Sequence, residues 1–432
     1  MTAAAVATPE FRSGFGRMRS ILSGSAGNLV EWYDWFAYSA FTLYFAKVFF
    51  PQGDQTAQLL NAAAVFGVGF LARPVGAWLM GLYADRRGRR AAMMLSVALM
   101  CVGSVIIAVC PGYAGIGALA PAILVGARIV QGLSLGGEYG CSAVYLSEMA
   151  GRERRGFWSS WQYVTIVVGQ LLALGLLLVL QAVLTPAQLQ AWGWRIPFAL
   201  GGLLAITVFW LRRDMRETPS FEARGPERAR TMLLFLKYPR ETLVVIGLTA
   251  GGTLAFYTYT TYMQKFLANT SGFSKSAATQ ITAGTLLLFM LIQPLGGWLS
   301  DRIGRKPMMI GFGVLGAIFT FPIMQALART HDFATAFALV MTALMILTGY
   351  SAVNAVVKAE LFPTEVRALG VALPYAIANA VVGGTAEYIA LWCKQHGHES
   401  WYFAYVAGLI GLSLIVYVFM RDTRKHSLIR ED

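Results

Sequence analysis

The chain has 432 residues, of which 56% are hydrophobic and 13% charged, whereas a soluble domain carries about 25% charged residues. With a mean hydropathy of +0.57, this composition excludes a soluble protein with a large core and indicates a multi-span membrane protein. A net charge of +13 would otherwise suggest a nucleic-acid partner, but the basic residues are distributed as in a membrane protein. The four cysteines form no Cys-x-x-Cys pair and lie in or beside apolar segments, which argues against a disulfide framework or a metal site.

Residues 1–20 are polar and lack the short apolar region and cleavage site of a removable signal peptide. About 20 consecutive apolar residues cross a bilayer, and this length predicts an all-α membrane protein with twelve transmembrane helices, six in each half of the chain. The charged segment 213–240 contains three prolines and is the predicted linker between bundles at 21–212 and 241–420, with a tail at 421–432. The predicted helices are 21–48, 56–82, 91–110, 119–147, 156–184, 194–212, 241–267, 277–299, 308–328, 333–360, 367–392 and 401–420.

A ten-residue motif occurs once in each half of the chain, with its aspartates Asp85 and Asp301 half the chain length apart. Both copies read Gly-x-x-x-Asp-Arg-x-Gly-Arg followed by a basic residue, between two apolar segments. One copy alone would fit a generic basic loop, but two in register indicate related halves, as in one large class of secondary transporters. We expect a tight gating turn in which the Asp caps a helix start or pairs with an Arg. The gating residues predicted from the motif are Gly81, Asp85, Arg86, Gly88, Arg89, Asp301, Arg302, Gly304 and Arg305.

The positions of the basic residues predict the orientation in the membrane. Of the 35 Lys and Arg residues, 26 fall on the side of the two termini, 6 in outer loops and 3 within helices. Because cytoplasmic loops are enriched in Lys and Arg, both termini are predicted to face the cytoplasm of a bacterial inner membrane. The six outer residues are Lys47, Arg195, Lys265, Lys275, Arg329 and Lys394, and the three within helices are Arg73, Arg128 and Lys358.

Four polar or small residues of the first helix share one face, since Gly27, Glu31, Asp34 and Tyr38 are spaced by four, three and four. Ionisable residues at membrane depth are costly and are therefore functional candidates. Two carboxylates one turn apart repel, so one of them could carry a proton. The alternative for Glu31 is a position near the inner surface, where it would be solvated or capped.

Two arginines are predicted to lie within helices. Arg73 directly precedes Pro74 near the middle of the second helix, where a buried guanidinium needs an anionic ligand or a structural ion pair with the first helix. The fourth helix carries a polar stripe that includes Arg128, Gln131 and Glu138, which is typical of a face lining a wet site. A purely structural Arg128–Glu138 pair is the alternative, although almost three turns separate the two residues.

Other polar positions give weaker signals. Lys358 lies near the inner end of the tenth helix and is predicted to be peripheral. Glu148 and Glu360 end helices four and ten, and we expect them to pair with the basic turns of the repeated motif and to separate when the halves rock. Arg155 and Arg367 follow these glutamates by seven residues and join the predicted gating set. The further residues predicted to bind substrate are Gln162, Tyr257, Tyr262, Asn379 and Glu387.

Several of these stretches resemble the major facilitator superfamily, namely the duplicated turn, the Arg-x-x-Gln-Gly at 128–132 and the run 360–367. Residues 27–34 and 131–140 are similar to the metabolite:proton symporter family, which moves citrate, shikimate, proline or betaine, and 2-oxo acids. Within that family, residues 162–165, 192–198 and 257–265 most resemble the branch that carries α-ketoglutarate. The likeness covers the whole chain except its tails and linker. Arg87 stands where relatives carry a histidine, so no titratable role is expected at that turn position.

The resemblance implies two bundles that rock about a site at the membrane midplane and a proton carried in symport. It pairs a helix-one carboxylate, Asp34 or secondarily Glu31, with Arg128, and Glu138 is the next candidate for the proton. Arg73, Arg128, Tyr38 and Gln131 would then bind α-ketoglutarate or a similar dicarboxylate, taken up by alternating access. The expected partners are a small organic anion and the lipid bilayer, with no cofactor, no nucleic acid and a monomeric state.

Other function classes were weighed against this one. A primary pump is disfavoured because the chain has no phosphate-binding loop of the form Gly-x-x-x-x-Gly-Lys-Ser/Thr and only a short linker. A sensor is disfavoured by the short C-terminal tail, a channel by the charges at midplane, and an enzyme by histidines confined to loops and the tail. The open alternative is the same transport mechanism with citrate, shikimate, or proline or betaine as the substrate.

Overall fold

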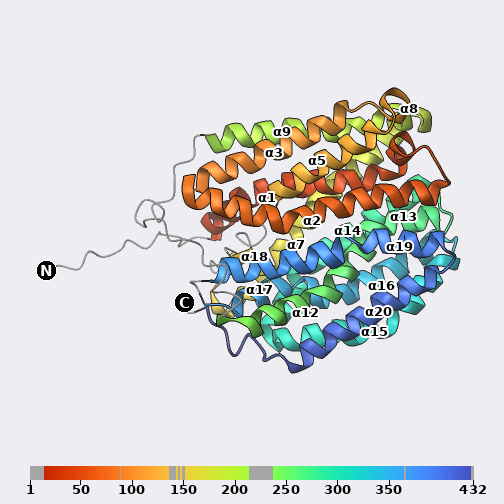
Figure 1. The fold of residues 1–432 in the computed structure, drawn as a ribbon. Coiled ribbons are helices and arrows are strands. Elements are labelled where there is room, and N and C mark those ends of the chain that lie inside the picture. Colours follow the sequence, from red (N-terminus) through yellow and green to blue (C-terminus); the bar gives the residue numbers. More distant parts are fainter. Residues whose placement is uncertain are drawn as a thin grey trace.

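The computed structural model describes residues 14–87, 89–135, 143–144, 146–147, 151–213, 237–363 and 366–429. This part of the chain consists of helices joined by short loops and contains no strand. The first half of the chain, in warm colours, and the second half, in cool colours, form two neighbouring groups of helices (Figure 1). The long helices of both groups run roughly parallel to one another.

Both halves are built from long helices with short connections. In the described part of the first half the long helices are α1 (Gly14–Phe49), α2 (Gln55–Arg87), α3 (Arg89–Val109), α5 (Leu119–Leu135), α7 (Arg155–Val183) and α9 (Ile196–Arg213), with short α4 (Tyr113–Ile116), α8 (Pro186–Ala191) and two 3₁₀ turns (Arg152–Arg154, Gly193–Arg195). The second half contains α12 (Pro239–Phe256), α13 (Met263–Asn269), α14 (Lys275–Ile303), α15 (Arg305–Arg329), α16 (Phe333–Ser351), α17 (Asn354–Glu360), α18 (Arg367–Ala378), α19 (Ala386–Gln395) and α20 (Glu399–Phe419).

Two spans of the second half are interrupted by π-helical segments. Tyr257–Tyr262 joins α12 to α13, and Asn379–Gly383 leads from α18 toward α19. The predicted helices 241–267 and 367–392 run through both places, and the structure has one helical stretch at each, Pro239–Asn269 and Arg367–Gln395, with a π-helical segment that the sequence did not predict. A π-helical segment adds one residue to the turn and re-aims the side chains around it, so such segments are frequent at functional sites.

Eight helical stretches of the described chain are long and apolar enough to cross a membrane. Together with α1, α3, α5 and α9 they make the twelve spans of the predicted all-α membrane fold. Large apolar side chains such as Val183, Leu295 and Phe419 are exposed on the outer surface, as contact with lipid chains requires. The eight stretches are Gln55–Met80, Arg155–Val183, Pro239–Asn269, Lys275–Ile303, Arg305–Arg329, Phe333–Glu360, Arg367–Gln395 and Glu399–Phe419.

The helix boundaries differ from the predicted ones mainly at the ends. The first helix begins at Gly14 instead of residue 21, because helical hydrogen bonding continues beyond the apolar stretch that a hydropathy criterion detects. The second copy of the motif contains a one-residue turn, since α14 ends at Ile303 and α15 begins at Arg305. Gly304 between them has a φ of 103°, which favours glycine. Residues 214–236 of the predicted linker, and most of 136–150 at and beyond the end of the predicted fourth helix, lie outside the described residues.

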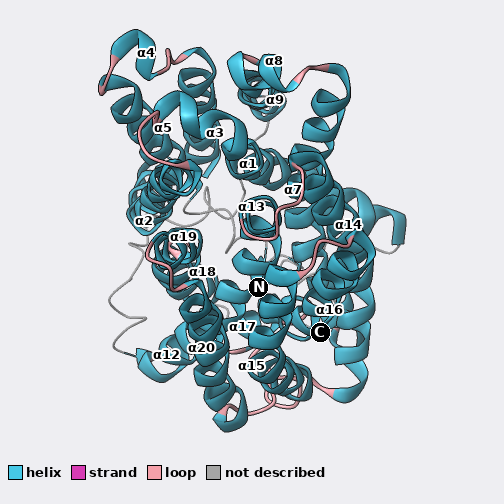
Figure 2. Cartoon of the chain, turned by 90° about the vertical axis from the view of Figure 1, so that its right-hand side faces the viewer, coloured by secondary structure: helices cyan, strands magenta, loops and turns pink. Residues whose placement is uncertain are grey.

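Two pairs of helical regions form the interface between the bundles. The helix α7 packs along α14, and α2 packs against α18, the Asn379–Gly383 segment and α19. Figure 2 looks along the helices and shows α1, α2, α3, α5 and α9 in one group and α12, α15, α16 and α20 in the other. The approach of α7 and α14 is very close, because a Cβ atom on Gly297 would lie 2.5 Å from the carbonyl oxygen of Gly156. Only glycine permits this contact, which explains Gly297 at the first position of the second motif copy.

The two ends of the molecule are distinguished by the chain segments that lie there. The C-terminus and the start of α12 lie at the left in Figure 1, and we call this end the tail end. The short helix α8 and α13 lie at the opposite end, which we call the loop end.

Candidate functional site

A hydrogen-bonded cluster surrounds Asp34, which is fully buried on α1. The hydroxyl of Ser104 on α3 donates to Asp34 Oδ1 at 2.5 Å, and the amide nitrogen of Gln131 on α5 donates to Oδ2 at 2.5 Å. The other end of the Gln131 amide, Oε1, accepts from Nη1 of Arg128 at 2.8 Å. The three helices therefore meet around one carboxylate, and Gln131 links this carboxylate to Arg128.

The sequence predicted Arg128 as the direct partner of Asp34, and this detail was wrong. Among the described residues no ion pair joins the two side chains, because the Gln131 amide lies between them. Arg128 and Gln131 are three residues apart and share a face of α5, so the sequence placed both toward the site. Which of the two reaches α1 depends on how α1, α3 and α5 pack against one another.

Two buried guanidinium groups lie against the ring of Trp35. The guanidinium carbon of Arg128 is 3.8 Å from the ring centroid, and that of Arg73 is 4.0 Å from it. Arg73 also stacks on Phe70 at 3.9 Å, and Arg128 on Tyr38 at 4.5 Å. Aromatic faces stabilise cations by about 0.5–2 kcal/mol each. Trp35 was not among the residues predicted from the sequence, although it lies directly after Asp34 on α1.

Both arginines have hydrogen-bond donors for which the described residues supply no acceptor with good geometry. The Nε and Nη2 atoms of Arg73 and of Arg128 are buried and have no hydrogen-bond partner with good geometry among the described residues. A buried donor left without an acceptor costs about 1–3 kcal/mol, and more when it is charged. Two guanidinium groups in this state indicate a site for an anion with several oxygen atoms.

Glu31 and Tyr38 occupy the same face of α1 as Asp34, as predicted. Glu31 is 3% exposed, accepts from the Ser96 hydroxyl at 3.3 Å and lies near Arg73, so the alternative of a solvated Glu31 is wrong. The Tyr38 hydroxyl donates to the carbonyl of Ala62 at 3.0 Å, and its ring faces Arg128. The predicted stripe is therefore a buried polar face within the first bundle.

The second bundle presents polar groups to the same region. Tyr257 and Asn379 come from the two π-helical segments, and the Tyr257 hydroxyl lies next to both the Arg73 guanidinium and the Asn379 amide. The Tyr257 hydroxyl and both polar atoms of Asn379 have no hydrogen-bond partner with good geometry among the described residues. The ring of Tyr257 packs edge-on against Phe70 of the first bundle at 5.2 Å. Unfilled polar groups of both bundles thus meet at the bundle interface.

The other predicted binding residues lie in more varied places. Gln162 is fully buried on α7, and Tyr262 packs against Tyr402 and Phe266 within the second bundle. Glu387 is buried on α19 and forms an ion pair with Lys265 at 2.7 Å. Glu138 lies outside the described residues.

Two lysines lie deeper than the sequence predicted. Lys265 was assigned to an outer loop but is fully buried on α13. Lys358 was predicted to be peripheral but is fully buried on α17, where it donates to Asn354 at 2.7 Å and stacks over Tyr375 at 4.1 Å. Both predictions were wrong because a lysine near the end of a predicted span was taken to lie at the membrane surface, whereas its side chain can face the interior of the bundle where polar partners are present.

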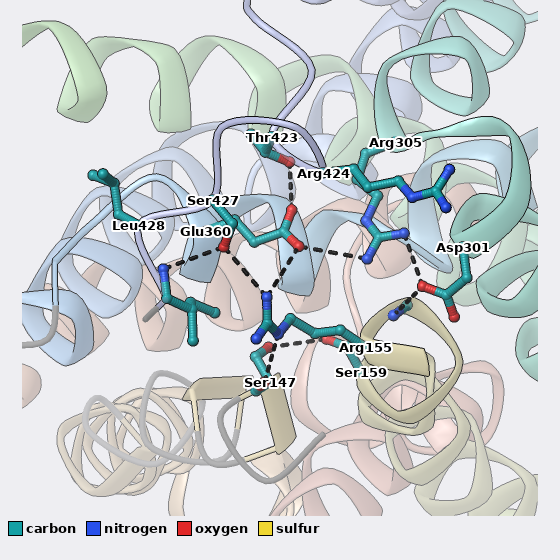
Figure 3. A network of polar contacts seen from close by, with 12 residues as sticks. Ser147, Arg155, Ser159, Asp301, Arg305, Glu360, Thr423, Arg424, Ser427 and Leu428 are labelled. Carbon is teal, nitrogen blue, oxygen red and sulfur yellow. Dashed lines mark hydrogen bonds and ion pairs between the residues drawn. The ribbon is translucent and has the colours of Figure 1, made fainter. Parts of the chain in front are cut away.

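A second polar network joins the bundles at the tail end (Figure 3). Asp301, from the second copy of the motif, accepts from the backbone N–H groups of Gly156 and Phe157 at 2.8 and 2.9 Å. These donors belong to the first turn of α7, so the carboxylate caps a helix of the other bundle. Arg305 contacts Asp301 at 2.8 Å and Glu360 at 3.4 Å. The motif Asp therefore does both things expected of it, and Glu360 pairs with the motif Arg.

The C-terminal segment closes this network, which the sequence analysis did not foresee. The hydroxyl of Thr423 donates to Glu360 Oε2 at 2.5 Å, and the backbone N–H of Leu428 donates to the Glu360 carbonyl at 3.0 Å. Ser427 accepts from Arg155 at 3.3 Å, and Arg155 also lies 4.0 Å from Glu360 (Figure 3). Residues predicted to form a free tail are thus packed against both bundles.

The remaining gating predictions fall in different places. Arg367 donates to the carbonyls of Phe362 and Leu428, at 3.1 and 3.2 Å, and so holds the C-terminal segment. Arg302 is exposed and stacks on Trp298 at 3.9 Å, away from the network around Glu360. Gly88, Glu148 and the side chains at Gly81, Asp85, Arg86 and Arg89 lie outside the described residues.

Replacing Asp301 with asparagine should slow transport about tenfold and leave the substrate affinity within about twofold, because a charge-assisted contact is worth about 1.5–3 kcal/mol. The change weakens the contact of α14 with α7 and leaves the cluster around Asp34 intact. Initial uptake rates and equilibrium binding in reconstituted vesicles measure the two effects. Asp332→Asn is the matched control, since Asp332 is an exposed helix cap where asparagine serves equally well. Lost binding with unchanged exchange rates would contradict a gating role.

The chain matches the family described as sugar (and other) transporters, and it does so twice, over residues 21–237 and 223–431. It is 51% identical to the alpha-ketoglutarate permease of Escherichia coli over 95% of both chains. It is 33% identical to a citrate-proton symporter of Klebsiella pneumoniae, over 95% of this chain and 94% of that one. It is 31% identical to the shikimate transporter of Escherichia coli, over 94% and 95%.

The fold is similar to a solved structure of the major facilitator proton:xylose symporter XylE bound to 6-bromo-6-deoxy-D-glucose. The TM-score is 0.78 at 19% identity, and the match covers 97% of this chain and 99% of that one. The double family match agrees with the duplicated motif, and these relatives are transporters, not enzymes. The chain therefore belongs to the sugar (and other) transporter family, and it has the fold of a major facilitator transporter.

Proposed function

We propose that this transporter takes up α-ketoglutarate, or a similar dicarboxylate, together with protons by alternating access. The observation that carries the proposal is the pair of buried arginines, Arg73 and Arg128, whose Nε and Nη2 donors have no acceptor with good geometry among the described residues. A guanidinium offers paired donors that match the two oxygens of a carboxylate. The 51% identity to an alpha-ketoglutarate permease supports this substrate over others.

Proton coupling is the second element of the proposal. Moving a dianion inward against the membrane potential costs about 2.3 kcal/mol per charge per 100 mV. One or more protons carried with the substrate offset this cost. Asp34 is the proposed proton carrier, because it is fully buried and because Gln131 links it to Arg128. The hydrogen bond between Gln131 and Arg128 therefore depends on the charge of Asp34. The proton is the coupling ion, and no cofactor is involved.

Uptake into proteoliposomes with an imposed pH gradient tests the function. We expect accumulation of α-ketoglutarate when the outside is acidic, and loss of that accumulation when a protonophore collapses the gradient. Citrate, shikimate and proline serve as the competing substrates, since relatives of the chain are named for transport of each. Uptake of one of these in preference to α-ketoglutarate would identify that compound as the substrate instead. Uptake without any response to the gradient would refute symport.

The proposed orientation places both termini in the cytoplasm, with the chain a monomer in a bacterial inner membrane. The basic residues support it through their excess on the side of the termini. Lys425 is an exposed position for a test, whereas Thr423 is buried against Glu360. A single cysteine at position 425, in a variant without the four native cysteines, should resist a membrane-impermeant maleimide in intact cells and react after permeabilisation. Ready labelling from outside would refute the orientation.

A further inference from the structure

A second charged cluster lies at the bundle interface, nearer the loop end. Lys265 on α13 is fully buried, and its ammonium group donates to Glu387 Oε2 and to the hydroxyl of Ser39, both at 2.7 Å. Glu387 belongs to the second bundle, like Lys265, whereas Ser39 belongs to α1 of the first. This cation therefore touches both bundles.

The position of Lys265 relative to the first cluster can be followed along α1. Ser39 directly follows Tyr38, whose ring faces Arg128 at 4.5 Å. Tyr38 is also close enough to Glu387 for an electrostatic interaction. Asp34 and Ser39 are five residues apart, which corresponds to about 7.5 Å along the helix axis. Lys265 thus lies roughly one and a half helical turns from the layer of Asp34, in the direction of the loop end.

A lysine ammonium group has three hydrogen-bond donors and no acceptor. Two of these donors are used by Ser39 and Glu387, and the described chain offers the third no partner. The end carboxyl carbons of an extended five-carbon dicarboxylate are about 5 Å apart, from four C–C bonds of about 1.5 Å. With the carboxylate oxygens added, such a molecule can reach from the arginine layer to the ammonium of Lys265.

We propose that Lys265 binds the second carboxylate of the dicarboxylate substrate, while Arg73 and Arg128 bind the first. This inference rests on the proposed function and adds the residue that selects two carboxylates over one. The first carboxylate is bound by the first bundle and the second by the second bundle, so a dicarboxylate joins both. A monocarboxylate fills the arginine site and leaves Lys265 with Glu387.

The test compares α-ketoglutarate with 2-oxopentanoate, which has the same five-carbon chain and lacks the second carboxylate. We expect Lys265→Met to weaken binding of α-ketoglutarate about 10- to 100-fold, as loss of one charge-assisted contact implies, and to change binding of 2-oxopentanoate less than twofold. Lys394→Met is the matched control, because Lys394 also lies near a glutamate, Glu399 at 3.9 Å, but is partly exposed. Binding of both ligands to the wild-type chain and to the two variants is measured in detergent or in proteoliposomes.

Replacing Glu387, the ion-pair partner of Lys265, with a neutral residue provides a second, independent test. Glu387 competes with the substrate carboxylate for Lys265, so Glu387→Gln should raise the affinity for α-ketoglutarate severalfold and leave that for 2-oxopentanoate unchanged. A purely structural ion pair predicts the opposite, an equal loss of binding for both ligands in both variants, and this result would overturn the inference. A loss confined to α-ketoglutarate in Lys358→Met and absent in Lys265→Met would also overturn it, by moving the second site to α17. Equal affinity of the wild-type chain for both ligands would refute the dicarboxylate function itself.

Discussion

Replacing Asp34 with asparagine is expected to abolish proton-driven accumulation of substrate while substrate binding and counterflow persist. Asparagine imitates the protonated carboxyl group, which carries no charge, and it cannot exchange a proton between the two sides. Accumulation should fall to the level without a gradient, whereas the dissociation constant should change by less than about threefold, or roughly 0.7 kcal/mol.

The hydrogen bonds around Asp34 give this expectation a mechanism. The ionised carboxylate accepts from the amide nitrogen of Gln131, which turns Oε1 of the same amide toward Arg128. When Asp34 is protonated, it can donate, and the favoured partner is then Oε1 of Gln131. The amide turns over, its nitrogen faces Arg128, and the guanidinium loses its acceptor. In the proposed mechanism, Arg128 would then be free to bind a substrate carboxylate, and this would couple the proton to the substrate.

The experiment measures equilibrium binding, counterflow and gradient-driven uptake at one fixed pH. Asp54→Asn is a suitable control, because Asp54 is an exposed residue that caps the start of α2, where asparagine is an equally good cap. If Asp34→Asn loses binding as severely as the arginine variants described next, Asp34 is a structural residue. The proton would then be carried elsewhere, with Glu138 as the next candidate.

Replacing Arg128 or Arg73 with lysine is expected to weaken substrate binding by about 1.5–3 kcal/mol, or roughly 10- to 100-fold. Lysine keeps the charge but loses the planar group that binds a carboxylate at two points. It also loses the flat contact with Trp35, which lies about 4 Å from both guanidinium groups. These variants differ from Asp34→Asn in that binding itself fails.

Isothermal titration or scintillation proximity binding with the purified variants measures the loss. Arg329→Lys provides the control, since Arg329 is exposed at the end of α15. Should both lysine variants bind the substrate as tightly as the wild type, the unfilled donors of Arg73 and Arg128 would not belong to the substrate site. The anion would then have to be bound by other buried cations, and the lysines Lys265 and Lys358 would be the next candidates.

The sequence by itself determined the class of protein, the spans and the duplication. These properties are local or periodic, because hydropathy over about 20 residues marks a span and a repeated motif marks a repeated half. The spacing on α1 likewise placed Glu31, Asp34 and Tyr38 on one face, because helical periodicity depends only on neighbours along the chain. The same periodicity indicated Arg128, and the position of Arg73 near the middle of a predicted span indicated Arg73.

Tertiary structure alone decided which of these side chains touch. Gln131 lies between Asp34 and Arg128 because three helices meet there, and no spacing along α5 encodes that meeting. Tyr257 and Asn379 face the interface through π-helical segments, which a periodicity of 3.6 residues does not anticipate. The remaining examples depend on contacts between residues far apart in the chain.

The burial of Lys265 and the packing of the C-terminal segment are the clearest of these. Lys265 contacts Ser39, 226 residues away, and Thr423 contacts Glu360, 63 residues away. Lys265 was counted with the outer loops and Thr423 with the tail, because a sequence pattern scores each residue by its own polarity. A charge is stable at depth only where distant side chains supply its partners, and those partners are known only once the helices are packed.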